Sequence, residues 1–192
     1  MIREAILALS LMSGALHAQD EGPQRPSPLH VFAGVAVPSS AQNYAVGPLV
    51  GFTSDIPFRS PVLGWRVEGS YASFKPGTVR RPIATVFSSP LPVDRTSELG
   101  FNLNGVLWSP YLNALPIRSY VDAGGSYSRL SDYATSGGVT YSHAGNHVGF
   151  NGGVGIDFPL AQFRARLDGR YKQIAVDGSQ FKTMLLTFGV RF

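Results

Sequence analysis

The last ten residues of the chain, 183–192, alternate between apolar and polar side chains and restrict the possible folds more than any other stretch. The apolar parity consists of Met184, Leu186, Phe188, Val190 and Phe192. The other parity carries Thr183, Thr187, Gly189 and Arg191, with Leu185 as its large apolar exception. A period of two predicts a β-strand with one apolar and one polar face. A strand of an ordinary β-sandwich that ends at Phe would show the same pattern.

The start of the chain differs in composition from the rest. A short charged stretch precedes an apolar run at 5–16, which is too short to cross a bilayer as a helix. The small residue Ala18 follows this run. The order predicts a secretory signal peptide at 1–18 that is cleaved after Ala18, with a buried N-terminal helix as the alternative. Residues 19–28 are charged and rich in proline, which predicts a flexible lead-in.

The remaining residues, 29–192, contain seven further alternating segments and no comparable apolar run. These segments lie at 29–37, 44–56, 63–74, 96–108, 119–127, 147–158 and 163–172. Pro48 weakens the second segment, because proline cannot donate a hydrogen bond to a neighbouring strand. Charged residues lie opposite the apolar ones in nearly every segment. The chain therefore predicts a single all-β domain over 29–192.

Strand length and loop pattern separate two architectures that share this periodicity. In a soluble sandwich or lipocalin-like barrel the apolar face lines a core, whereas in a membrane barrel it meets lipid. The segments approach the length of a tilted strand that crosses a bilayer, about 10 residues, and exceed the soluble average of about five or six. Short connections such as 109–118 alternate with two long ones, 75–95 and 130–146. We therefore predict an eight-stranded antiparallel up-and-down transmembrane β-barrel, with both termini at one end and the long loops at the other.

These features together resemble the small eight-stranded outer-membrane barrels of the OmpA/OmpX type. The stretch Ser-Tyr-Val-Asp-Ala-Gly-Gly-Ser-Tyr at 119–127 is similar to recurrent strand phrases of that family. So is Asn-Gly-Gly-Val-Gly-Ile-Asp-Phe-Pro at 151–159. The resemblance spans 29–192 and implies a location in the bacterial outer membrane, with lipid around the barrel and a periplasmic lead-in at 19–28.

The resemblance also assigns a role to the terminal strand. Its aromatic end, with apolar residues at alternate positions before it, is similar to the assembly signal of outer-membrane barrels. It implies that Phe188, Val190 and Phe192 form this signal and that the barrel-assembly machinery is a partner.

The polar parity of the predicted strands would face the barrel interior. The charged residues on that parity are Arg66, Glu68, Glu98, Asp122, Asp157, Arg164, Arg166, Asp168, Arg170, Lys172 and Arg191. Acidic and basic groups are nearly matched, and an eight-stranded barrel is just wide enough for side chains to fill. We interpret the set as a paired plug that stabilises the barrel, because removing one partner of a buried pair costs roughly 3–5 kcal/mol. A narrow polar path or gated pore is the alternative.

Other candidate sites are weaker. Ser142 with His143 could suggest a lipid-modifying hydrolase, but no acid lies near them in the sequence. His143 and His147 make a weak metal site without a carboxylate. The glycine-rich stretch 149–155 leads into a strand, whereas a phosphate cradle needs a helix N-terminus. The arginine pair at 80–81 could meet anionic sugars or lipid phosphates, or could simply be solvated. We predict no catalytic residue, metal or cofactor.

The function expected from this sequence is a membrane-structural or surface-interaction role. The net charge of +4 comes without a basic cluster interleaved with aromatics, so nucleic acid is not predicted as a partner. The long loops at 75–95 and 130–146 are the candidate ligand-binding parts, because loops on a rigid scaffold commonly carry function. A narrow passive channel for small solutes and a lipid-modifying enzyme are the alternatives.

Overall fold

The computed structural model describes residues 29–39, 44–58, 62–76, 93–109, 117–160, 163–176 and 179–191. The predicted signal peptide at 1–18, the lead-in at 19–28 and Phe192 lie outside these ranges. The arginine pair at 80–81 also lies outside them. These features therefore remain expectations from the sequence.

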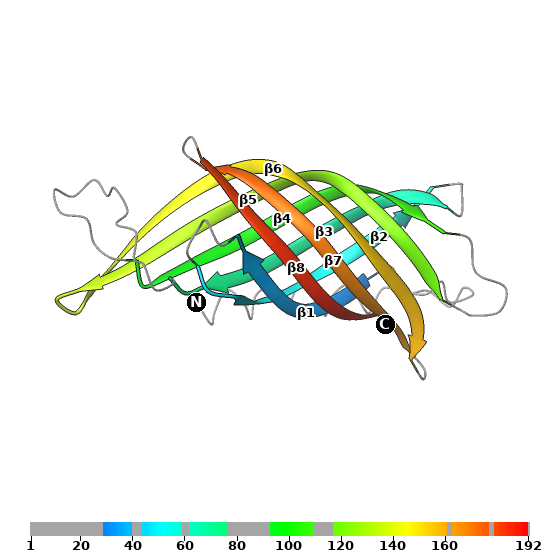
Figure 1. Ribbon diagram of the computed structural model, residues 1–192, viewed down its shortest axis with the longest axis horizontal. Helices are drawn as coiled ribbons and strands as arrows, with labels where there is room; N and C mark the ends of the chain where they lie inside the picture. Colours follow the sequence, from blue (N-terminus) through cyan, green and yellow to red (C-terminus); the bar gives the residue numbers. More distant parts are fainter. Residues whose placement is uncertain are drawn as a thin grey trace, which may run out of the picture.

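Eight antiparallel strands form a closed barrel, in which each strand pairs with its neighbours in sequence and the last strand pairs with the first (Figure 1). The strands are β1 (Leu29–Pro38), β2 (Gly47–Pro57), β3 (Leu63–Phe74), β4 (Arg95–Trp108), β5 (Arg118–Ser136), β6 (Val139–Leu160), β7 (Phe163–Val176) and β8 (Ser179–Arg191). The predicted fold class is confirmed. We call the end of the barrel at which β1 begins and β8 ends the terminal end, and the opposite end the hairpin end.

The pairing register shows that the strands are strongly staggered. Leu29 pairs with Ser54, and following the paired residues from strand to strand leads to Lys182 of β8. The Lys182 carbonyl then accepts a hydrogen bond from the backbone N–H of Ser39 at 2.9 Å, ten residues beyond Leu29. Such a stagger tilts the strands and closes them around an interior that side chains can fill.

The apolar parity of each strand points outward. Exposed large apolar side chains include Val50, Phe52, Trp65, Tyr71, Leu99, Phe101, Leu103, Leu107, Val121, Tyr127, Phe150, Val154, Leu167, Leu186 and Phe188. Adjacent residues on β7 illustrate the arrangement, because Leu167 is 45% exposed whereas Arg166 is 5% exposed. The barrel thus has a largely apolar exterior and places most of its charges inside. Within the described ranges, no helix is long and apolar enough to cross a membrane.

The β5–β6 hairpin is longer than the sequence predicted. The loop expected at 130–146 is instead a continuation of both strands, and Gly137 and Gly138 form the turn with φ angles of 58° and 80°. Positive φ at both central residues is typical of the two-residue hairpin turn that matches strand twist. The loop prediction is wrong because apolar alternation disappears where both faces of a sheet meet water, while backbone pairing continues without it. The hairpin projects well beyond the other strands in Figure 1.

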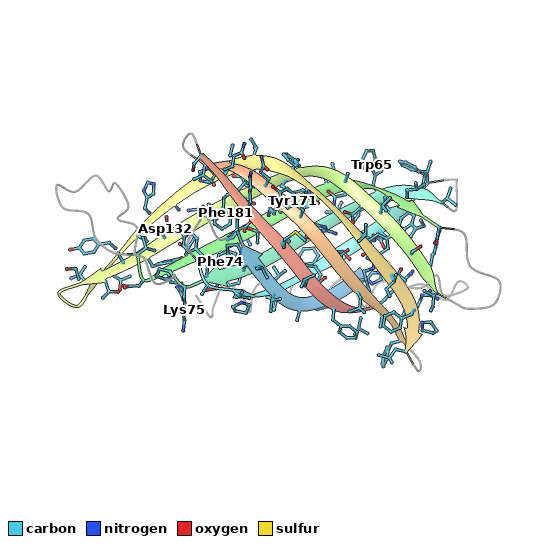
Figure 2. The ribbon with its side chains drawn as sticks, in the orientation of Figure 1. Trp65, Phe74, Lys75, Asp132, Tyr171 and Phe181 are labelled. Atoms are coloured by element: carbon cyan, nitrogen blue, oxygen red, sulfur yellow. The ribbon has the colours of Figure 1, made fainter. Side chains whose placement is uncertain are left out.

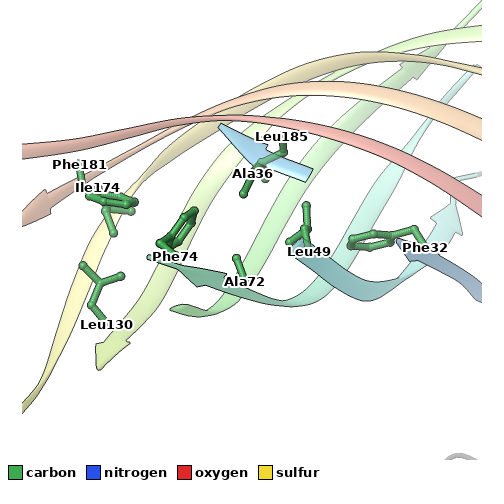
Figure 3. Close-up of a cluster of buried hydrophobic side chains, with 9 residues drawn as sticks. All are labelled: Phe32, Ala36, Leu49, Ala72, Phe74, Leu130, Ile174, Phe181 and Leu185. Carbon is green, nitrogen blue, oxygen red and sulfur yellow. The ribbon is translucent and has the colours of Figure 1, made fainter. Parts of the chain in front are cut away.

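The interior of the hairpin half is largely apolar. Its cluster comprises Phe32, Ala36, Leu49, Ala72, Phe74, Leu130, Ile174, Phe181 and Leu185 (Figure 3). Phe74 ends β3 and Phe181 lies near the start of β8, so the cluster is centred toward the hairpin end. The ring centroids of these two residues are 5.7 Å apart, and Tyr44 packs against both rings. The inward parity is therefore polar only in part, and Leu185 belongs to this cluster.

Candidate functional site

The inward-facing charges of the terminal half form a connected network, and Arg66 lies at its centre. Arg66 is fully buried. Its Nε donates to Asp55 Oδ1 at 2.7 Å, and its Nη1 donates to Asp122 Oδ2 at 2.8 Å. Asp55 is the register partner of Arg66 on β2, whereas Asp122 comes from β5. One guanidinium therefore links strands on different sides of the barrel.

Arg166 extends the network across the barrel to β2. It donates to Asp157, its register partner on β6, at 2.6 and 3.1 Å, and to Asp55 at 2.7 Å. The ring of Tyr120 lies beside both arginines, with its centroid 4.1 Å from Arg66 Cζ and 5.0 Å from Arg166 Cζ. The Tyr120 hydroxyl donates to Asp168. Asp55 and Tyr120 thus hold two cations close together.

Arg170 connects further carboxylates to the same network. It donates to Glu68, to Asp122 at 3.0 Å and to Asp168 at 3.4 Å. Glu68 also accepts a hydrogen bond from the Asn102 amide at 2.7 Å. Asp122 therefore bridges Arg66 and Arg170, and every arginine of this network contacts at least two carboxylates.

Lys172 and Glu98 form a separate pair within the apolar half. Lys172 Nζ donates to Glu98 Oε1 at 2.5 Å, and the Ser128 hydroxyl donates to the same oxygen at 2.9 Å. The register partners of Glu98 are Ala72 and Leu130, both members of the apolar cluster. This pair is therefore the charged component of a largely apolar layer.

The structure places the sequence-predicted charges in three groups. The network brings together Arg66, Glu68, Asp122, Asp157, Arg166, Asp168 and Arg170, and Lys172 meets Glu98 elsewhere. Arg164 and Arg191 are half-buried register partners at the terminal end. Sequence reasoning left out Asp55, although it lies on the parity opposite Phe52 and Ile56. It also left out Tyr120, because no spacing in the sequence indicates that this ring lies beside two arginines.

The cavity found beside the network, among the residues that the structure describes, is small. It has a volume of about 10 Å³ and lies among residues that include His30, Thr53, Glu68 and Arg170. Such a volume accommodates about one water molecule. The packing favours the plug interpretation of these charges over a narrow polar path.

The hairpin is the second candidate site, because one of its edges is exposed. Every residue of β6 from Val139 to Asp157 pairs with β5. Pairing with β7, in contrast, begins only at Gly149. In the described part of the chain, no strand pairs with the second edge of residues 142–148. Such an edge presents backbone N–H and C=O groups that can pair with another strand.

The two faces of the hairpin carry different side chains. Asp132, which accepts a hydrogen bond from Thr96, pairs in register with His143, and His147 lies on the same face. Ser142 lies on the opposite face, because successive strand residues point to opposite sides. The Ser142–His143 combination therefore lacks the geometry of a nucleophile and its base. Among the residues that the structure describes, no three His, Cys, Asp or Glu side chains are grouped as a metal site.

Comparison with solved structures identifies a protein of similar fold. Neisserial surface protein A (NspA) matches with a TM-score of 0.59 and 18% identity, over 88% of this chain and 98% of that one. The chain has the fold of the small eight-stranded outer-membrane barrels. The resemblance to this group that the sequence indicated is confirmed.

Two further structures are more distant. A major outer membrane protein from Thermus thermophilus matches with a TM-score of 0.49 and 15% identity, over 85% of this chain and 99% of that one. Ail from Yersinia pestis, in complex with the heparin analogue sucrose octasulfate, matches with a TM-score of 0.45 and 17% identity, over 86% and 97%. No protein-family model and no curated protein matches the chain.

Proposed function

We propose that this protein is an integral outer-membrane barrel that binds an extended segment of another polypeptide through its β5–β6 hairpin. The observation that carries the proposal is the second edge of residues 142–148, which no described strand occupies. An exposed strand edge adds an incoming strand by main-chain hydrogen bonds, and side chains at alternate positions supply selectivity. The charged network and the apolar side chains inside the barrel have structural roles in this proposal.

The exterior supports insertion in a membrane. Outward aromatic side chains occur toward the terminal end, where Phe58 and Trp65 pack at a centroid distance of 5.8 Å, and toward the hairpin end at Tyr71 and Tyr127. Apolar side chains fill the exterior between these levels. A band of this kind between two aromatic girdles is typical of membrane barrels. Outer-membrane lipid is therefore the expected surrounding.

The orientation follows from the expected route of export. Residues 1–18 direct export in this proposal, and the assembly machinery recognises Phe188, Val190 and Phe192. The terminal end then faces the periplasm, and the hairpin faces the outside of the cell. Hydrogen-bonding groups on an exposed edge attract other strands. We therefore expect a protein with so long an exposed edge to bind a partner strand there.

Membrane insertion is tested by cysteine labelling on β7. We expect a lipid-phase quencher to reach a fluorophore at Leu167→Cys and not at Arg166→Cys in folded protein reconstituted in vesicles. The band on a gel should also shift after boiling, as it does for a folded barrel. Equal access of both positions to a water-soluble quencher would contradict the membrane assignment.

Strand addition is tested with an array of immobilised extended peptides and amide hydrogen exchange. A peptide that binds should slow exchange at residues 142–148, because their backbone groups become hydrogen-bonded. Substituting residues 142–147 one at a time by proline should abolish binding at alternate positions, where the N–H faces the free edge. Ala144→Val keeps its N–H and serves as the matched control. Binding that leaves exchange at 142–148 unchanged would show that the edge is not used.

A further inference from the structure

The outward-facing charges of the described strands all have the same sign. They are Lys75, directly after β3, Arg95 of β4, Arg129 of β5 and Lys182 of β8. The acidic side chains of the barrel strands, Asp55, Glu68, Glu98, Asp122, Asp157 and Asp168, lie on the inward parity instead. Asp132 lies on the inner face of the hairpin, and Asp94, before β4, accepts a hydrogen bond from the Thr135 N–H at 2.7 Å. Within the described strands, every outward-facing charge is therefore positive.

These cations also share one level of the barrel. Arg129 follows Tyr127 by two residues on the same face of β5, and Lys75 follows Tyr71 by four on β3. Lys182 pairs in register with Gln173, which itself lies two residues beyond Tyr171. These three cations thus lie just outside aromatic residues at the hairpin end of the apolar band, and the pairing of Phe74 with Thr96 puts Arg95 beside Lys75. Figure 2 shows Lys75 projecting away from the barrel, far from Trp65 near the other end of the same strand.

Three of the four cations come from consecutive strands and form what we call the basic patch: Lys75, Arg95 and Arg129. Adjacent strands lie about 4.8 Å apart, and residues along a strand about 3.3 Å apart. The pairing of Phe74 with Thr96 puts Lys75 beside Arg95. Arg95 pairs with Tyr133, four residues beyond Arg129, so the backbones of Arg95 and Arg129 lie about 14 Å apart. Arg95 stacks over the Tyr133 ring at 4.6 Å, and Arg129 pairs in register with Asn146, an amide that can also donate. Lys182 lies alone on β8, on another part of the circumference.

We propose that the basic patch binds the phosphate groups of an anionic glycolipid in the outer leaflet; this inference rests on the proposed membrane location. A lipid phosphate lies at the boundary between the apolar band and water, which is the level of these cations. Arginine and lysine donate charge-assisted hydrogen bonds to phosphate oxygens. The acyl chains of the same lipid contact the apolar exterior directly below the patch. A free phosphate ion would gain nothing from that exterior, so the patch favours a lipid.

The test uses the folded barrel in detergent micelles, titrated with lipid A and followed by native mass spectrometry. A basic residue near a charged membrane surface contributes about 1 kcal/mol, which corresponds to about a fivefold change in affinity. We expect Lys75→Gln to weaken lipid A binding about fivefold and Lys75→Gln with Arg129→Gln to weaken it about 25-fold. Lys182→Gln is the matched control, since it removes an identical side chain at the same level outside the patch. Its effect should be less than twofold.

Two further titrations identify the ligand. Lipid A from which the phosphates have been removed should bind no better than the double variant binds intact lipid A. Inorganic phosphate at the same concentration should not compete. Three results would each overturn the proposal. The dephosphorylated lipid could bind as tightly as intact lipid A, Lys75→Gln and Lys182→Gln could weaken binding equally, or inorganic phosphate could compete.

The result also separates this proposal from the proposed function. A barrel that passes the β7 quenching test but does not distinguish the two lipids refutes the patch alone. A chain that fails the quenching test refutes the membrane location and the patch together.

Discussion

The two halves of the barrel interior are filled by different kinds of side chain. In the terminal half, Arg66, Arg166 and Arg170 each contact two or more carboxylates from other strands. In the hairpin half, aromatic and aliphatic side chains around Phe74 and Phe181 pack together without ion pairs among themselves. The stability of a charged layer depends on the direction of its hydrogen bonds and on which groups pair, whereas that of an apolar layer depends mainly on how well side-chain volume fills the space. The halves should therefore respond differently to substitution.

The largest effect is expected from Arg66→Met in the charged half. The change leaves the buried Asp122 and the half-buried Asp55 with one cation fewer, and breaking a buried pair in this way costs roughly 3–5 kcal/mol. The measurement is the free energy of unfolding in lipid vesicles by urea titration. Lys182→Met, which removes an outward cation, should change it by less than about 1 kcal/mol. A loss for Arg66→Met no larger than that of the control would mean that the network contributes little.

A somewhat smaller effect is expected from Phe74→Ala in the apolar half. Removing a buried phenyl ring costs about 3 kcal/mol, at the low end of measured values, because this ring lies at the end of its strand where neighbours can move inward. The loss should be the same in low and high salt, unlike a loss that arises from charge. Phe74→Leu should recover most of the stability. A salt-dependent loss for Phe74→Ala would show that the two halves are not independent.

The smallest net effect is expected at Lys172 and Glu98, the charged pair within the apolar half. Lys172→Met alone leaves Glu98 buried without its cation and should destabilise strongly. Adding Glu98→Gln keeps an acceptor for Ser128 and removes the charge, so the double variant should lie within about 1–2 kcal/mol of the parent. A double-mutant cycle on urea unfolding measures the coupling. Additive effects of the two substitutions would contradict a direct interaction between these residues.

The sequence predicted the fold because inside and outside follow from parity alone. Leu167 and Arg166 are neighbours in sequence and face opposite sides, and this alternation needs no knowledge of distant residues. Parity also placed most interior charges on the correct face of their strands. It could not predict which of them meet, because the partners of Arg66 depend on the stagger of strands that lie far apart in sequence.

Two features of the candidate sites lay beyond the sequence for different reasons. Beyond Ala134, the extension of β5 and β6 has no apolar period, since both of its faces are largely exposed from Thr135 to Asn146, and the Gly137–Gly138 turn was the remaining local signal. The apolar cluster was hidden because Phe74 and Ile174 lie on a parity that is polar elsewhere on the same strands. Residue type alone does not reveal at what level along the barrel the inward side chains change from charged to apolar.

The pairing of β1 with β8 has a kinetic consequence. Every other pair of strands is joined by a local connection, so those hairpins can form soon after their residues are available. The β1–β8 seam joins residues such as His30 and Arg191, which are separated by most of the chain, and so carries the largest loop-closure entropy. It is also tight, because a Cβ at Gly34 would lie 2.0 Å from the Leu186 carbonyl oxygen. Sealing this seam should therefore be the slow, final step of folding, and Gly34→Ala should delay it while the seven hairpins still form.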